Sequence, residues 1–433
     1  GESELERSFR VARKTADGWE VVAEGPSGRE PAQLLRGPDD RLYVLCWPEG
    51  APRLWVSDAG GANFAPAAVP GNWDAPNHWP YFSTGMAPDG TLYLLRSGGG
   101  KPGYFKWASR DATTGLWGAV HRVDIDYRYA YTYLLPTAEH GGYLASLRDV
   151  IWADLGYSQP AGAFDYCFNA VKSWYSPDPA EQPFTETLVR EELPTGQYAR
   201  PNISLNYHGD AYVDNHGRSH ILCPVQGGST GGARRLIHYI YDGSDLIKLM
   251  TLPTSITNGR LIQNAAGKFF LLTFREATLY VYPAADANGL QLEAPVTLSL
   301  QGHAVRYSNL HLAAPRTGTP LADRVDVVYP AGESAEQWIY FQLQLPPEGP
   351  ADTTLLPVPA LKIFPNPVHD LLFLRGLGED AGVVVFNLAG QVIWRRTGLY
   401  EEVQIDTSAW PAGIYLLWVD TTQGLVMRKL VRQ

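Results

Sequence analysis

The candidates for proton transfer and for binding a carboxylate are His78, Tyr131, Tyr133 and Arg148. A histidine gains or loses a proton near neutral pH, and a tyrosine beside a cation can exchange a proton with a sugar oxygen. Arginine stays charged and binds a carboxylate through two parallel hydrogen bonds. Tyr129, Tyr131 and Tyr133 alternate along one expected strand, so we expect them to face one side of a sheet. This combination suits acid–base chemistry on an acidic ligand.

Other polar and aromatic residues could bind the same ligand. Tyr207 and His208 are candidates for contact with a substrate, Arg200 could bind an acidic sugar, and Trp79 offers a ring on which a sugar can stack. Further candidate cations are Arg234, Arg235 and Arg275. Each candidate also has a plain structural interpretation, such as a loop cap, a ring packed between sheets, or the partner of a carboxylate.

The chain offers little sign of a metal or cofactor site. His208, His216 and His220 lie around an expected blade turn at Asn215-His216-Gly217 and not on a helix, which favours a turn over a zinc site. We therefore expect that no cofactor is required, with a structural calcium ion as an open alternative.

A repeat of short strands organises most of the chain. Each unit holds apolar strands joined by an Asp-Gly type of turn, as in Pro88-Asp89-Gly90, and six units are readable. Recurrence every ~40 to 60 residues is the mark of a β-propeller built from four-stranded blades. Residues 9–13 and 19–22 have no inner strands before them, so we expect them to complete a blade begun near residue 305 and close the ring. A sandwich or jelly roll is the alternative.

Composition and charge limit the class of protein. The chain has 433 residues and 45% hydrophobic residues, enough for a large core. The net charge of −10 argues against a nucleic-acid binder, and no apolar run approaches the ~20 residues that span a bilayer. The three cysteines Cys46, Cys167 and Cys223 lie far apart, so we expect buried free thiols.

The C-terminal part has a different pattern. Short alternating strands separated by turns predict a small immunoglobulin-like β-sandwich at residues 361–433. A proline-rich stretch predicts a linker at residues 347–360, which leaves residues 1–346 for the propeller. The predicted fold class is therefore all-β, a β-propeller followed by a β-sandwich.

The C-terminal motifs resemble the sorting domain of the type IX secretion system of Bacteroidota. They are Lys362-Ile363-Phe364-Pro365-Asn366-Pro367, then Val385-Phe386-Asn387-Leu388-Ala389-Gly390, then Pro411-Ala412-Gly413-Ile414-Tyr415 and Met427-Arg428-Lys429. The resemblance implies a protein exported through the periplasm and outer membrane, with the type IX machinery as a partner.

Residues 30 to 345 resemble the BNR-repeat propellers that include ulvan lyases and related propellers cutting rhamnose–glucuronate linkages. The resemblance lies in Asn77-His78-Trp79-Pro80 with Met86-Ala87-Pro88-Asp89-Gly90, and in Tyr131-Thr132-Tyr133 with Arg148-Asp149. It implies seven blades and gives His78, Tyr131 or Tyr133, and Arg148 the places of the lyase residues. Arg96 stands near the place of a second expected histidine, which is a departure from the lyases.

These observations lead to one functional hypothesis and two alternatives. We expect a secreted monomeric lyase that cleaves a uronate-containing polysaccharide by β-elimination, with Arg148 neutralising the carboxylate. One alternative is a glycoside hydrolase, an α-L-rhamnosidase of the related gum-degrading propellers. The other is a glycan-binding propeller without catalytic activity.

Overall fold

The computed structural model describes residues 7–15, 18–28, 30–71, 73, 81–139, 141–195, 200–205, 208–275, 277–300, 311–313, 321–331, 337–346, 362–387, 392–421 and 424–433. Strands and three short 3-10 turns make up its regular structure. The chain divides into two compact units, residues 1–13 with 21–341 and residues 14–20 with 342–433. No helix of the described residues is long and apolar enough to cross a membrane.

Antiparallel sheets follow one another along the first unit, and in each the strands are arranged from the centre outward. The first two sheets are β3 (Gln33–Arg36), β4 (Arg41–Cys46), β5 (Arg53–Ala59) and β6 (Ala65–Ala67), then β7 (Tyr81–Met86), β8 (Leu92–Gly99), β9 (Gly103–Arg110) and β10 (His121–Ile125). The third sheet is β11 (Tyr129–Pro136), β12 (Gly142–Ile151), β13 (Tyr166–Ser176) and β14 (Thr185–Glu191).

The remaining sheets of this unit continue the pattern. The fourth is β15 (Asn202–Ile203) and β16 (Asp210–Val213) with β17 (Ser219–Gln226), β18 (Arg235–Asp242) and β19 (Asp245–Thr251). The fifth is β20 (Arg260–Gln263), β21 (Phe269–Arg275), β22 (Thr278–Pro283) and β23 (Val296–Ser299). The sixth contains β24 (His311–Ala313), β25 (Arg324–Ala331) and β26 (Gln337–Gln344).

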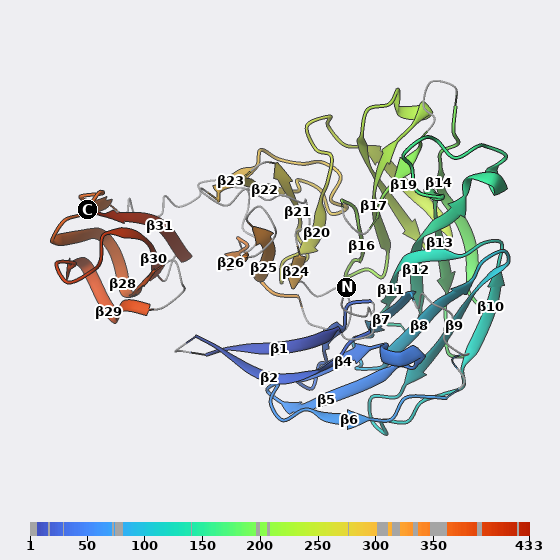
Figure 1. Cartoon of the computed structure of the whole chain (residues 1–433), viewed down its shortest axis with the longest axis horizontal. Coiled ribbons are helices and arrows are strands. Elements are labelled where there is room, and N and C mark those ends of the chain that lie inside the picture. Colours follow the sequence, from blue (N-terminus) through green and yellow to red (C-terminus); the bar gives the residue numbers. More distant parts are fainter. Residues whose placement is uncertain are drawn as a thin grey trace. The chain divides into compact units, whose positions relative to one another are not determined.

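The inner strands show how these sheets are arranged in space. Strands β3, β7, β11, β16 and β20 each lie beside the next, and Figure 1 shows the sheets spread around a common centre. Gln33 of β3 joins the first sheet to the second. Its Nε2 donates to the Phe82 carbonyl of β7 at 3.0 Å, and its Oε1 accepts from the Thr84 amide of β7 at 2.8 Å. This radial order of antiparallel sheets is a β-propeller, which confirms the predicted fold class.

Alternating side chains bind each sheet to both of its neighbours. In β8, Leu92 and Leu94 pack into a core shared with the first sheet. Tyr93 and Leu95 point the other way, into a core shared with the third sheet. Each fully buried side chain of this kind stabilises the fold by roughly 1.5–3 kcal/mol. The middle strands are therefore apolar on both faces, whereas an outer strand such as β19 is largely exposed.

The N-terminal strands differ from the expectation. Strands β1 (Ser8–Thr15) and β2 (Gly18–Pro26) form a two-stranded sheet of their own, and within the described residues they do not extend the sheet of β24 to β26. Phe9 packs edge-on against Trp55 with ring centroids 5.1 Å apart, in a core with Val44 and Cys46 of β4. The hairpin thus covers the face of the first sheet that the second sheet leaves free. The seven blades implied by the resemblance stay a prediction.

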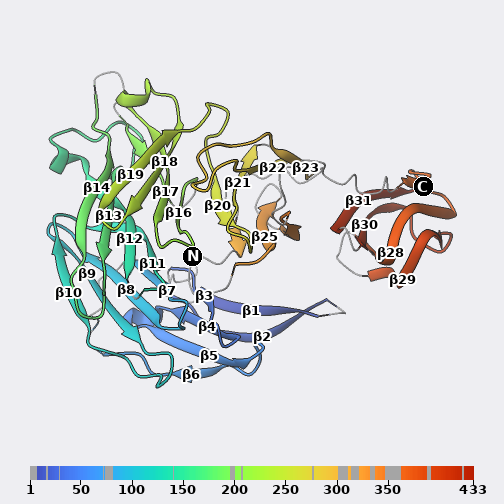
Figure 2. The same ribbon diagram turned by 180° about the vertical axis from the view of Figure 1, so that it is seen from behind.

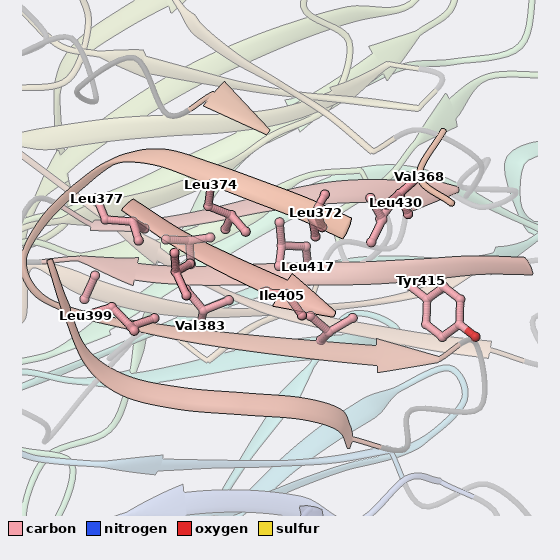
Figure 3. Close-up of a cluster of buried hydrophobic side chains, with 14 of the residues drawn as sticks. Val368, Leu372, Leu374, Leu377, Val383, Leu399, Ile405, Tyr415, Leu417 and Leu430 are labelled. Carbon is pink, nitrogen blue, oxygen red and sulfur yellow. The ribbon is translucent and has the colours of Figure 1, made fainter. Parts of the chain in front are cut away.

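The C-terminal unit contains a five-stranded antiparallel sheet that curls around one apolar core (Figures 2 and 3). Its strands are β27 (Lys362–Phe364), β28 (Leu371–Asn387), β29 (Val392–Asp406), β30 (Gly413–Thr421) and β31 (Gly424–Arg432). Leu372, Leu374, Val383 and Leu417 are completely buried there. The predicted linker, residues 347–360, lies outside the described residues.

The three cysteines are buried and free, as predicted.

Candidate functional site

Three of the predicted site residues that the structure describes lie at one rim of the propeller. Adjacent strands of a sheet are antiparallel, so the start of an inner strand lies beside the end of the next one, as in the pairing of Tyr129 with Arg148. Neighbouring sheets meet at the same edge: the Gly259 amide, just before β20, donates to the carbonyl of His208, just before β16, at 3.0 Å. The rim where the inner strands begin therefore carries Tyr131, Arg148 and His208.

Three predicted residues, His78, Trp79 and Tyr207, lie outside the described residues. Their assigned roles stay predictions. Tyr133 is half-buried on β11 opposite Ala145, where it packs against the core between the third and fourth sheets. The exposed Arg200 donates from Nη2 to the Ala161 carbonyl, and within the described part of the chain it has no acidic partner.

The three alternating tyrosines do not face one side, so that expectation was wrong. The pairing of β11 with β12 shifts between Ala130 and Tyr133, and Tyr131 has a φ of 53°. This bulge reverses the alternation: Tyr129 packs against Trp174 in one core, whereas Tyr131 and Tyr133 pack against the core on the opposite face. A bulky residue rarely adopts a positive φ, and such strained positions cluster at functional sites.

Arg148 is held by two side chains of its own sheet and lies near Asp126, which precedes that sheet. Its Nε donates to Asn169 Oδ1 at 3.1 Å, its Nη2 donates to a carboxylate oxygen of Glu191, and its Nη1 lies 3.9 Å from Asp126. The side chain is 15% exposed. A substrate carboxylate would have to compete with Glu191 for this guanidinium. The predicted neutralising role therefore stays a prediction, beside a clear structural role.

A second group of basic side chains lies at the same rim and is named here the cationic rim cluster. It consists of His208 just before β16, Arg234 just before β18 and Arg260 at the start of β20. Burial, together with the smaller effect of the charges of Arg234 and Arg260, lowers the pKa of His208 to about 4. His208 is thus uncharged at neutral pH. Its Nδ1 is buried and has no hydrogen-bond partner among the described residues.

The two arginines of this cluster differ in their surroundings. Arg260 is 8% exposed, and its Nη1 donates to the Gly209 carbonyl. Gly209 is required there, because a Cβ atom would lie 2.3 Å from the Leu222 carbonyl oxygen. Arg234 is half-buried just before β18, and burial lowers its pKa. Within the described residues Arg234 has no ion pair or hydrogen bond. Most partly buried arginines have a partner, so Arg234 is suited to bind an anion from outside.

A third group consists of aromatic rings, named here the aromatic track: Phe164, Tyr166, Phe168, Tyr131 and Tyr81. Consecutive ring centroids lie 5.6, 5.6, 5.7 and 5.1 Å apart. The sequence interpretation selected only Tyr131 of these. Phe164, Tyr166 and Phe168 nevertheless alternate in the sequence, which predicts that their rings lie on one side. At the inner end, the Arg128 guanidinium lies 5.7 Å from the ring centroid of Tyr81 and pairs with Asp149.

The remaining histidine cluster is internal. His220 Nε2 lies 3.1 Å from Asp214 Oδ2, and His220 Nδ1 lies 3.0 Å from His238 Nε2. Both rings are buried within the fourth sheet. The described residues contain no group of three His, Cys, Asp or Glu side chains that could hold a metal ion. The open question of a structural calcium ion stays a prediction.

Comparison with solved structures finds distant likenesses. PorZ, a bacterial surface component of the type IX secretion system of Porphyromonas gingivalis, is 12% identical, with a TM-score of 0.43 over 98% of this chain and 56% of PorZ. The polysaccharide lyase Uly1 is 10% identical, with a TM-score of 0.46 over 72% of this chain and 77% of Uly1. An α-L-arabinanase of Penicillium chrysogenum is 9% identical, with a TM-score of 0.44 over 72% of this chain and 92% of the arabinanase.

Comparison of the sequence identifies the C-terminal unit. No curated protein matches the chain. The family model of the secretion system C-terminal sorting domain matches residues 362–433, which are the residues of β27 to β31. This confirms the predicted sorting domain. Residues 362–433 are a type IX sorting domain, and the protein is exported to the cell surface or the medium.

Proposed function

We propose that the propeller is a polysaccharide lyase that cleaves a uronate-containing polysaccharide by β-elimination. The observation that carries this proposal is Arg234, a half-buried arginine beside His208 with no partner among the described residues. A guanidinium held this way binds a carboxylate through two parallel hydrogen bonds. An acidic sugar supplies that carboxylate on an exported protein.

β-Elimination makes three demands on a site. The C5–H bond and the bond from C4 to the glycosidic oxygen break, and a double bond forms between C4 and C5. A base takes the C5 proton, an acid gives a proton to the leaving oxygen, and a cation stabilises the negative charge that builds up on the carboxylate side. Each proton transfer typically contributes about 100- to 10,000-fold in rate.

The residues of the rim can meet these demands. Arg234, supported by Arg260, holds and neutralises the carboxylate. His208 is uncharged at neutral pH, so it can accept a proton, and the bound carboxylate raises its basicity by offsetting the two nearby positive charges. Tyr131, on the neighbouring inner strand, is the proton donor in this assignment. His78 stays a second candidate for the base, and Arg148 for the neutralising cation.

Glycan binding without cleavage is the second candidate function. It is favoured by the aromatic track, since exposed rings can bind sugars without any proton transfer.

The experiment that tests the proposal exposes the full chain to ulvan, gum arabic and other acidic polysaccharides. Ultraviolet absorbance reports an unsaturated uronate, and a parallel assay reports new reducing ends. Both signals are expected from a lyase. Reducing ends without absorbance would indicate a hydrolase, and binding without either signal would indicate a glycan-binding propeller.

A further inference from the structure

The aromatic track joins three parts of the chain that are far apart in sequence. Phe164 precedes β13, Tyr166 and Phe168 lie in it, Tyr131 lies on inner strand β11, and Tyr81 begins inner strand β7. The contacts run from ring to ring without a break: Phe164 stacks on Tyr166 at an interplanar angle of 14°, and the later pairs meet edge to face. The track therefore extends from the third strand of a blade to the centre of the ring.

Exposure distinguishes this track from ordinary packing. Phe164 is 75% exposed, and the other four rings are partly exposed. The aromatic residues that only build the cores, such as Phe105 and Trp174, are buried. Large apolar side chains left accessible in a row commonly mark a binding surface.

The backbone at Tyr131 supports the same interpretation. A positive φ at a bulky residue is strained and persists only where the surroundings enforce it. Here the strained bulge places the Tyr131 ring between Phe168 and Tyr81, 5.7 and 5.1 Å away. Without the bulge, Tyr131 would share the face of Tyr129 and the track would be interrupted.

Charge indicates which ligand suits the track. Arg200 is exposed and reaches the Ala161 carbonyl, three residues before Phe164, and has no acidic partner within the described residues. Arg128 lies over Tyr81 at the inner end, although Asp149 balances its charge. Sugar rings present C–H faces that pack on aromatic rings, and a carboxylate on the sugar would pair with Arg200.

We infer that the aromatic track is an extended binding site for an acidic polysaccharide chain, which stacks its sugar rings from Phe164 inward and pairs a carboxylate with Arg200. The inference rests on the proposed function for the class of ligand only. The track needs a polymer long enough to cover several rings. Substitutions in the track should therefore weaken the binding of long chains. They should not change the binding of short oligosaccharides, which reach only the cationic rim cluster.

Binding of ulvan and gum arabic to full-length Phe164→Ala, measured by affinity electrophoresis, tests this inference. Each lost stacking contact should weaken polymer binding roughly two- to tenfold. Arg200→Gln should weaken binding of the acidic polymers and leave binding to dextran, a neutral glucan, unchanged. Leu116→Ala is the matched control, since Leu116 is 70% exposed on the loop between β9 and β10. All three substitutions change exposed side chains, so the three variants should fold.

The outcomes separate this inference from the proposed function. Weaker binding in Phe164→Ala and Arg200→Gln supports the track, even if the wild type cleaves nothing. Cleavage by the wild type with an unchanged KM for the polymer in Phe164→Ala rejects the track and leaves the lyase intact. Binding of neither polymer by the wild type, or equal losses in Leu116→Ala, overturns the inference.

Discussion

Arg148 donates a hydrogen bond from Nε to Oδ1 of Asn169 at 3.1 Å, which ties the second strand of the third sheet to the third strand. With Glu191 on β14, this arginine joins three strands of one blade. The sequence interpretation offered a structural alternative in which Arg148 pairs with a carboxylate of a neighbouring blade; in the structure Arg148 pairs with a carboxylate of its own blade.

Arg148→Lys should therefore lower stability. Lysine keeps the charge but cannot serve Asn169 and Glu191 together, and hydrogen bonds to charged groups contribute about 1.5–3 kcal/mol each. Thermal melting of the full-length variant should show the loss. An unchanged melting temperature together with a severe loss of turnover would instead give Arg148 the catalytic role predicted from the sequence.

Stability should also fall as the pH is lowered below neutrality. Burial lowers the pKa of His208, His220 and His238, to about 4 for His208. In the unfolded chain these histidines take up protons near pH 6.5, whereas in the folded protein they stay neutral. Protonation therefore favours the unfolded state as the pH drops below about 6.5. For His208 this loss of stability is complete near pH 4.

Melting curves between pH 8 and pH 5 check this expectation, because few carboxylates titrate in that window. His208→Asn should show a weaker dependence on pH than the wild type. A melting temperature that stays constant over the window would contradict the assignment of three neutral histidines.

Deletion of residues 351–433 should leave a folded propeller, because the sheets of the first unit pack against one another with their own cores. Circular dichroism and a melting curve on the truncated protein measure the outcome. Cooperative loss of structure would show that the C-terminal unit belongs to the same folding unit.

The same deletion has a different consequence in the native host. Removal of the sorting domain should trap the protein within the cell envelope, as fractionation and immunoblotting would show. Undiminished export would contradict a sorting role for residues 362–433.

Local patterns in the sequence predicted much of this fold. Asp89-Gly90 forms the expected turn: Gly90 has a φ of 91°, and the Thr91 amide donates to Asp89 Oδ1 at 2.8 Å. The bulge at Tyr131 was not predictable, because a single extra residue in a strand leaves no mark on an alternating pattern. The N-terminal strands were expected to complete the last blade, whereas within the described residues they form a sheet of their own, since pairing partners far apart in sequence depend on tertiary contacts.

The site was less predictable than the fold. The sequence identified Arg234 only as one of several cations, because the absence of a partner depends on the whole neighbourhood. Arg260 was missed for the same reason, since it lies beside His208 only through the packing of β16 against β20. The alternation of Phe164, Tyr166 and Phe168 was a readable signal of a shared face.

Turnover of an acidic polysaccharide by Arg234→Gln tests the central claim most directly. Release of unsaturated uronate from ulvan or gum arabic should fall by about two orders of magnitude, as expected for the loss of a charged contact worth roughly 3 kcal/mol, with the melting temperature preserved. Arg41→Gln, an exposed arginine at the start of β4 on the opposite rim, should keep wild-type turnover. Wild-type turnover in Arg234→Gln would contradict the proposal and move the site away from the cationic rim cluster.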